Sequence, residues 1–216
     1  MLGVAGWRPL ERFLRGRGLS LGVRRFVAGE TAEEAKRVLE GLSEENLGTI
    51  VDVLGEFVET EAAAREMTET ITASLHTLAG TATEPALSVK PTQLGLGVGF
   101  DLALDNAREV AKTAGEHGFE LCLDMESFEY VDGTLDLYRA LHAEGHTNVS
   151  TVLQAYLRRT QDDLDRLLAE SATVPALRVV KGAYKESARV AFQREAEIDR
   201  EFLEMVHKLT AAGAKA

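Results

Sequence analysis

Cysteine is almost absent from this sequence, which has only Cys122 among its 216 residues. A single cysteine excludes an intramolecular disulfide and any cysteine-rich metal cluster, and this is typical of a protein from a reducing compartment. Cys122 lies in an apolar run, which predicts a small core residue rather than a reactive thiol. The 5 histidines are scattered, mostly on predicted helices or helix ends, so no metal site is predicted.

Long apolar runs and net positive charge are absent too. No stretch approaches the ~18–20 apolar residues of a membrane span, and the first residues lack the apolar core of a signal peptide. We therefore expect a cytoplasmic protein. A formal net charge of -11 would repel a phosphate backbone, which argues against a general nucleic-acid binder.

One short segment departs from this acidic character. Residues 12–25 contain 5 arginines and no acid, interleaved with apolar residues: Arg12, Arg15, Arg17, Arg24 and Arg25. Such a basic amphipathic segment could lie on the inner, anionic face of a membrane. The simpler interpretation, which we favour, is a solvated cap whose arginines pair with acids of the same chain.

Residues 177–186, LRVVKGAYKE, form the most informative segment. An apolar, β-branched run that ends in glycine is typical of a buried parallel strand as it leaves the sheet. Arg178 and Lys181 lie within this predicted strand, and Tyr184 follows at its exit. Because a buried charge needs a partner, the two cations predict an anionic group nearby: a carboxylate, a phosphate or an electron-rich ring system.

Three earlier segments share this plan of an apolar run that ends in polar side chains. They are residues 87–92 with Lys90, residues 119–126 with Asp124 and Glu126, and residues 148–156 with Gln154 and Tyr156. Helical patterns follow the four strands at residues 101–117, 134–144, 161–171 and 187–212. This alternation predicts an α/β fold, either a β/α barrel or a doubly wound sheet, with ligands at the carboxyl ends of the strands.

The chain before the first of these strands is predicted to be helical. Thr31 and Ser43 are suitable N-caps for helices at residues 32–41 and 44–58, and a helical pattern continues to about Leu78. We therefore divide the chain into an N-terminal helical region, residues 1–80, and four βα units, residues 81–216.

Several alternatives are open for the polar residues. Lys90 or Lys181 could form a Schiff base, as in barrel lyases and aldolases. Asp124 and Glu126 point to one face if the strand persists, so the pair could mark a metal site. No further metal ligand is near in the sequence, and Glu126 is better explained as an exposed loop acid. The glycines at 95–99 have the wrong spacing for a dinucleotide-binding loop and predict a mobile loop instead.

The ordered set of motifs resembles the proline dehydrogenase family. The matching pieces are LGEFV at 54–58, SVKPTQLGL at 88–96, LDME at 123–126, LQAYLRR at 153–159 and RVVKGAYKE at 178–186. The resemblance implies a TIM-like β/α barrel that follows N-terminal helices. It also implies oxidation of L-proline to Δ1-pyrroline-5-carboxylate by hydride transfer to FAD, with a membrane quinone or another acceptor taking the electrons.

The resemblance also implies roles for individual residues. Asp124 and Arg178 would be catalytic, with Arg178 close to flavin N5. Lys90 and Tyr184 would bind the substrate, with Lys90 on its carboxylate. The residues implied for cofactor binding are Met125, Gln154, Arg178, Lys181, Gly182 and Ala183. Tyr156 is better explained as a core residue than as a ligand contact.

The sequence departs from the family at its end, because it stops after four predicted strands. The family continues with more strands, one of which holds the flavin, and with paired arginines that bind the substrate carboxylate. We therefore expect the first half of a barrel, with weak flavin binding and self-association through an open sheet edge. A non-catalytic barrel fragment is the remaining alternative.

Overall fold

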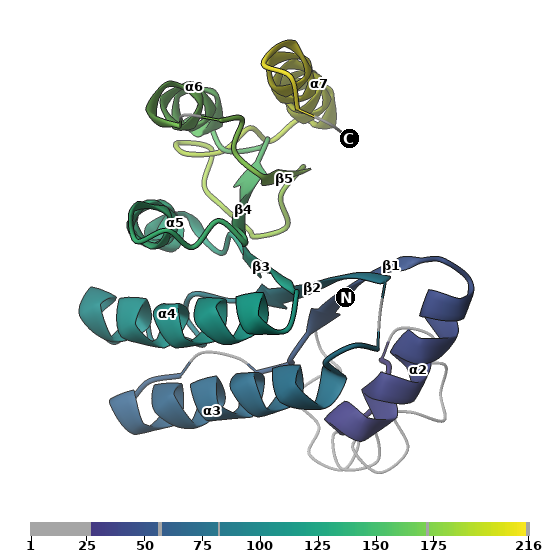
Figure 1. Ribbon diagram of the computed structural model, residues 1–216. Helices are drawn as coiled ribbons and strands as arrows, with labels where there is room; N and C mark the ends of the chain where they lie inside the picture. The colour runs from purple at the N-terminus through teal and green to yellow at the C-terminus, as the bar shows by residue number, and fades with distance from the viewer. Residues whose placement is uncertain (1–26, 56–57, 82, 172, 215–216) are drawn as a thin grey trace, which may run out of the picture. The chain divides into compact units, whose positions relative to one another are not determined.

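The computed structural model describes residues 27–55, 58–81, 83–171 and 173–214 (Figure 1). In chain order the elements are α2 (Ala32–Glu44), β1 (Gly48–Asp52), α3 (Glu61–Leu78), β2 (Thr83–Val89), α4 (Phe100–Glu116), β3 (Glu120–Leu123), the 3-10 helix η3 (Phe128–Tyr130), α5 (Val131–Ala143), β4 (Val149–Gln154), α6 (Thr160–Glu170), β5 (Leu177–Val180) and α7 (Glu195–Ala211). The chain separates into two compact units. The smaller comprises Met1–Thr49 and Thr77–Thr83, and the larger comprises Ile50–His76 and Glu84–Ala216.

Helix α2 belongs to the smaller unit and begins where the sequence predicts. The Thr31 hydroxyl accepts a hydrogen bond from the Glu34 backbone N–H at 3.2 Å, which satisfies one of the free donors of the first turn. Two acids in that turn, Glu33 and Glu34, interact favourably with the positive end of the helix dipole. The helix ends at Glu44, and Asn46 follows with a φ of 57°.

The predicted helix over residues 44–58 is wrong, because this segment contains strand β1. The β-branched residues Thr49, Ile50 and Val51 suit an extended backbone, and the strand is completed by its neighbour β2 in the sheet. That neighbour is distant in the sequence, so the local pattern did not indicate it. Among the described residues the sheet therefore has five strands rather than the four predicted.

The sheet runs in the order β1-β2-β3-β4-β5. The pairs β2–β3, β3–β4 and β4–β5 are parallel, and Leu121 of β3 lies opposite Leu87 on one side and Val149 on the other. Helices α4, α5 and α6 connect these strands and lie along one side of them in Figure 1. Parallel strands joined by helices in strict sequence order are the arrangement of a β/α barrel, which confirms the predicted fold class.

The core of the larger unit lies between the strands and these helices. Helix α4 buries small side chains, Ala103, Ala107, Ala111 and Ala114, which let its backbone approach the sheet closely. Cys122 is buried in β3, as predicted for a core residue. This packing fixes the carboxyl ends of the strands, where the polar side chains lie.

Helix α7 begins at Glu195, later than the predicted start at residue 187. The segment before it is held by the turn after β4, because the Phe192 N–H donates to the Tyr156 carbonyl at 2.8 Å and Ala191 forms a β-bridge with Leu157. In the described segments, no helix is both long enough and apolar enough to cross a membrane. The arginine segment at residues 12–25 lies outside the described residues.

Candidate active site at the carboxyl ends of the strands

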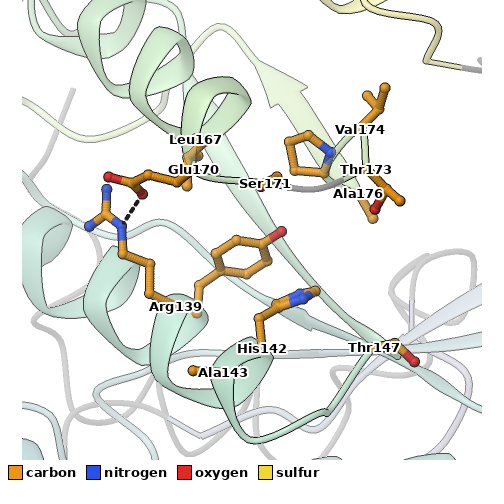
Figure 2. Close-up of a pocket in the computed structure, with 12 residues that line it drawn as sticks. Arg139, His142, Ala143, Thr147, Leu167, Glu170, Ser171, Thr173, Val174 and Ala176 are labelled. Atoms are coloured by element: carbon orange, nitrogen blue, oxygen red, sulfur yellow. Dashed lines mark hydrogen bonds and ion pairs between the residues drawn. The ribbon is translucent and has the colours of Figure 1, made fainter.

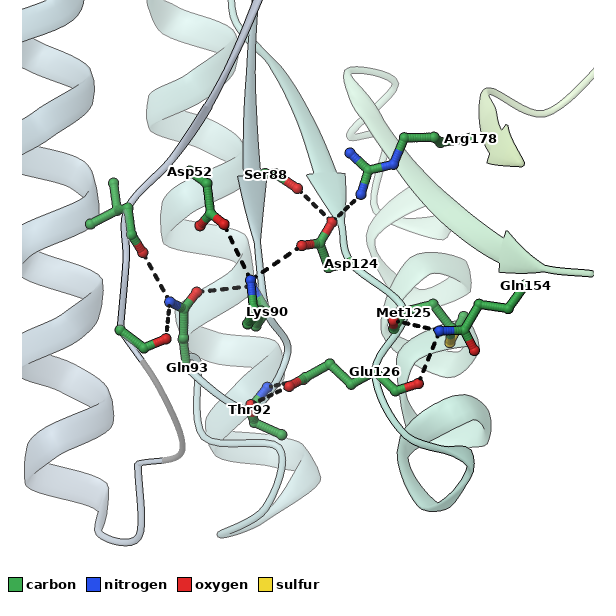
Figure 3. A network of polar contacts seen from close by, with 12 residues as sticks. Asp52, Ser88, Lys90, Thr92, Gln93, Asp124, Met125, Glu126, Gln154 and Arg178 are labelled. Carbon is green, nitrogen blue, oxygen red and sulfur yellow. Dashed lines mark hydrogen bonds and ion pairs between the residues drawn. The ribbon is translucent and has the colours of Figure 1, made fainter. Parts of the chain in front are cut away.

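Polar side chains from all five strand ends lie together in the larger unit, in two hydrogen-bonded groups (Figure 3). Asp52, Lys90, Asp124 and Arg178 form an ionic network, and Gln154 is bonded to the carbonyls of the segment after β3. Asp52 ends β1, Lys90 follows β2, Asp124 follows β3, Gln154 ends β4, and Arg178 lies in β5. Parallel strands bring their carboxyl ends to the same edge, so five separate segments of the sequence contribute to one site. Four of these residues were predicted site residues; Asp52 was not.

Asp124 is the centre of the network. Its Oδ1 accepts hydrogen bonds from Ser88 Oγ at 2.5 Å and from the Arg178 guanidinium, and its Oδ2 lies 3.4 Å from Lys90 Nζ. One carboxylate therefore pairs with cations from two other strands. The sequence predicted an anionic partner for Arg178, and in the structure this partner is a carboxylate.

Lys90 is held by two acids and by its own backbone. Its Nζ lies 3.2 Å from Asp52 Oδ2, in addition to its contact with Asp124, and its N–H donates to Gln93 Oε1 at 2.9 Å. Burial alone would lower the pKa of Lys90, but the two carboxylates outweigh burial and the pKa is raised. The side chain is therefore a charged ammonium at neutral pH, whereas a Schiff-base lysine needs a lowered pKa.

Glu126 is not the exposed loop acid that the sequence suggested. Its side chain is 2% exposed and accepts hydrogen bonds from the Thr92 N–H at 2.9 Å and the Thr92 hydroxyl at 2.7 Å. Burial raises the pKa of Glu126, and the two Thr92 hydrogen bonds lower it by less. The carboxyl group joins the segment after β3 to the turn after β2.

Among the described residues, no cluster of three or more His, Cys, Asp or Glu side chains is arranged to hold a metal ion.

Gln154 has an unsatisfied acceptor. The residue is 3% exposed, and its Nε2 donates to the carbonyls of Met125 at 3.0 Å and Glu126 at 3.3 Å. Its Oε1 has no hydrogen-bond partner within the described chain. A buried amide oxygen without a donor is unfavourable, so this position suits a ligand that brings an N–H or O–H group.

Lys181 faces away from the network. It lies just after β5, its side chain is 52% exposed, and its Nζ pairs with Asp199 of α7 at 2.6 Å. The hydrogen bond and charge of Asp199 raise the pKa of Lys181, which disfavours this lysine too as a Schiff base. The sequence placed Lys181 inside a buried strand; the structure places it on the surface beside α7.

Gly182 lies against the ring of Tyr156. Its φ is +112°, and a Cβ built there would lie 2.2 Å from Tyr156 Cδ1, so the backbone position requires glycine. Tyr156 is buried, as predicted for a core residue, and burial together with the charge of Glu186 raises its pKa to about 12. Of the next two residues, Ala183 is exposed and Tyr184 is half-buried. The roles expected for them, Ala183 in cofactor binding and Tyr184 in substrate binding, stay predictions.

Sequence reasoning missed four residues that the structure adds to the site: Asp52, Ser88, Thr92 and Gln93. Three of them lie within the motif SVKPTQLGL, where polar residues beside Lys90 were a usable signal. Asp52 was hidden by the wrong helix over residues 44–58. Its role depended on recognising β1 as a strand beside β2.

A separate cavity of about 600 Å³ lies between the C-terminal half of α5 and the segment before β5 (Figure 2). It is lined by Arg139, which pairs with Glu170 at 2.8 Å, and by His142, whose Nε2 donates to the Val149 carbonyl at 2.8 Å. None of the predicted site residues lines it. It also lies near the amino ends of β4 and β5, the end of a β/α barrel that serves stability rather than catalysis.

Fold and site together define a β/α-barrel protein with an ionic network at the carboxyl ends of its strands. The chain belongs to the proline dehydrogenase family, because residues 35–215 match the model of that family. It is 36% identical over 220 residues to the proline dehydrogenase of Deinococcus radiodurans, covering 99% of this chain and 69% of the relative. It is 34% identical over 199 residues to proline dehydrogenase 1 of Bacillus subtilis, covering 92% of this chain. The matched part is 65% of the Bacillus protein's length.

Solved structures show the same fold. Proline utilization A (PutA) from Bdellovibrio bacteriovorus superposes with a TM-score of 0.80 at 22% identity, over 94% of this chain and 26% of that one. PutA from Bradyrhizobium japonicum, in its D778Y mutant form, gives a TM-score of 0.77 at 24% identity, over 95% of this chain and 24% of that one. These similarities support the barrel fold that the strand order indicates.

Proposed function

We propose that this chain takes part in the flavin-dependent oxidation of L-proline to Δ1-pyrroline-5-carboxylate. The observation that carries the proposal is the Lys90–Asp124–Arg178 network, in which three segments that resemble the family's motifs meet at one site. Family membership supports the same reaction. The network offers an ammonium for a carboxylate and a guanidinium for an electron-rich group, as this substrate and cofactor require.

The residues fit FAD in two respects. Gln154 Oε1 is a buried acceptor that needs a donor, and the Arg178 guanidinium, which is partly exposed, has donors beyond the one bonded to Asp124. Gln154 and Arg178 would therefore hold the ring system, and Met125, Lys181, Gly182 and Ala183 complete the proposed cofactor-binding set. When bound, FAD would supply the acceptor for a hydride from the carbon next to the proline nitrogen.

The chain's own side chains would orient the substrate and stabilise charge. Lys90 remains an ammonium and would bind the proline carboxylate, with Tyr184 as a further substrate contact. Arg178 stays charged at any working pH and would stabilise negative charge that develops beside it. Asp124 would keep both cations in position, because it contacts each of them.

The electron acceptor, the location and self-association belong to the same proposal. A membrane quinone or another oxidant would take the electrons, and the protein would be cytoplasmic with a peripheral contact on the inner face of the membrane. Residues 12–25, which would make that contact, lie outside the described part of the chain. Self-association through the edge strand β5 is supported by the partial exposure of all four of its residues.

A direct test uses the protein loaded with FAD. L-Proline added without oxygen should bleach the flavin absorbance, and the imine product should react with o-aminobenzaldehyde; D-proline is the control substrate. Failure of the loaded protein to bleach would contradict the proposal. Borohydride trapping with a carbonyl substrate tests the Schiff-base alternative, and the raised pKa values of both lysines predict no covalent adduct.

A further inference from the structure

Asp52 is the least constrained acid in the network. Its carboxylate has Lys90 as its only bonded partner among the described residues, at 3.2 Å. Asp124 is also bonded to Ser88 and Arg178, and Glu126 is fixed by Thr92. The Asp52 side chain is 35% exposed, compared with 18% for Asp124. Asp52 can therefore leave its position at the loss of one partly solvated contact.

The charges explain why this freedom matters. Lys90 and Arg178 are balanced by Asp52 and Asp124, so these four ion-paired side chains carry no net positive charge to spare for a ligand. A ligand carboxylate that binds Lys90 would bring a third anion to a cation that already contacts two. Like charges so close repel one another, so the ligand binds more favourably if one acid withdraws. Asp124 is fixed from two other sides, which leaves Asp52.

We propose that Asp52 is a positioning residue that holds the Lys90 ammonium in the free protein and competes with the carboxylate of an incoming ligand. Asp52 would thereby set the affinity for carboxylate-bearing ligands. The identity of that ligand as L-proline rests on the function proposed above. The competition itself rests only on the contacts of Lys90, so it can be tested without flavin.

The first test measures the reactivity of Lys90 in the 216-residue chain. Acetic anhydride acylates the neutral amine, and peptide mass spectrometry reports acylation of Lys90 alone. Asp52→Asn removes the negative charge with little change in shape and should speed acylation about two- to fivefold, as expected for a partly exposed ion pair. Asp105→Asn on the surface of α4 is the matched control, because Asp105 pairs with Arg108 outside the network.

The second test measures competition directly. Cyclopentanecarboxylate, a ring carboxylate without an amine, should protect Lys90 from acylation, whereas cyclopentanecarboxamide should not. Asp52→Asn should lower the concentration that gives half-protection about two- to fivefold. An unchanged or higher concentration would overturn the inference. So would an unchanged acylation rate, because it would show that Asp52 does not act on Lys90.

The third test connects the inference to catalysis. In the FAD-loaded protein, Asp52→Asn should lower KM for L-proline, and the effect should disappear when Lys90 is replaced by Met, since Asp52 acts through Lys90. If the unaltered protein and the Asp52→Asn variant oxidise L-proline with the same KM, the inference is contradicted. A protein that shows the protection shift and never oxidises L-proline contradicts the proposed function alone.

Discussion

The polar network depends on a small number of charged residues. Replacement of Arg178 tests whether this residue interacts with the cofactor. Arg178→Met removes the charge and keeps much of the volume. If Arg178 stabilises reduced flavin, the flavin potential should become more negative and turnover should fall about tenfold or more. Potentiometry and steady-state rates of the FAD-loaded protein measure both, with Arg108→Met on α4 as a control. Unchanged potential and turnover would remove Arg178 from this role.

Replacement of Lys90 tests whether this residue binds the substrate. Lys90→Ala should weaken proline binding about ten- to hundredfold, because a hydrogen bond to a charged group is worth about 1.5–3 kcal/mol. Flavin content should stay intact, since Lys90 is not among the proposed cofactor-binding residues. Titration with proline and the visible spectrum separate the two effects. Loss of flavin with normal proline affinity would reassign Lys90 to the cofactor.

Glu126 predicts a pH dependence of stability. Its pKa is raised in the folded protein, so its charged form is disfavoured there. The favourable contribution of this carboxyl group is complete below the unfolded pKa of about 4.3 and is lost as the pH rises through the higher folded value. Glu126→Gln has no charge and can still accept from the Thr92 N–H, so it should be more stable than the unaltered protein near pH 7.

Urea unfolding at several pH values tests this prediction. The advantage of Glu126→Gln should shrink as the pH falls below about 4.3, where both side chains are neutral. Glu129→Gln is a control, because Glu129 is exposed on η3. A variant that is less stable by the same amount at every pH would show that the Thr92 hydrogen bonds, rather than burial of charge, dominate at this position.

At the scale of the element, Gly182 decides how the chain leaves β5. Gly182→Ala should destabilise the fold by at least about 2 kcal/mol, because the new Cβ meets the Tyr156 ring and φ is positive. Gly145→Ala is the matched control: Gly145 also has a positive φ, +94°, but nothing lies within 4 Å of its Cβ position. Chemical denaturation of both variants separates backbone strain from the clash. Equal losses of stability in the two variants would exclude the clash with Tyr156 as a cause.

Local patterns predicted the elements that form from neighbouring residues. The strands at Lys90, Asp124, Gln154 and Arg178 and the helices α4, α5 and α6 were found from apolar periodicity and from polar strand ends. Strand β1 was missed because its stability comes from β2, more than 30 residues later in the chain. The late start of α7 has a similar cause, since the turn after β4 holds the segment that precedes it.

Contacts between residues that are distant in the sequence also limited the prediction of the site. The positions of Lys90, Asp124, Gln154 and Arg178 at strand ends predicted that they would meet, since parallel strands share one edge. The burial of Glu126 depends on Thr92, a partner 34 residues away, and its own sequence neighbours did not indicate it. Lys181 was misplaced because the strand ends one residue before it, at Val180. Arg178 and Lys181 are three residues apart, so the alternation of side chains along a strand sends them to opposite faces, Arg178 to Asp124 and Lys181 to Asp199.

At the scale of the whole molecule, β5 is an edge of the described sheet. Its Val180 carbonyl accepts from the N–H of Ala155, the residue just after β4, and by the alternation of a parallel strand the backbone groups of Val179 face away from β4. Unpaired edge groups are a template for another chain. We therefore expect the 216-residue chain to self-associate as its concentration rises, measured by sizing chromatography with light scattering.

The substitution Val179→Pro tests whether β5 makes this contact. Proline removes the N–H that faces the free edge and leaves the ladder to β4 in place, so self-association should weaken while the helical circular dichroism is kept. Val152→Pro in β4, which has a strand on each side, is the contrasting variant: proline fits poorly inside a sheet, so it should unfold the protein. A chain that remains monomeric at every concentration, or one whose association is unchanged by Val179→Pro, would show that β5 is not the contact surface.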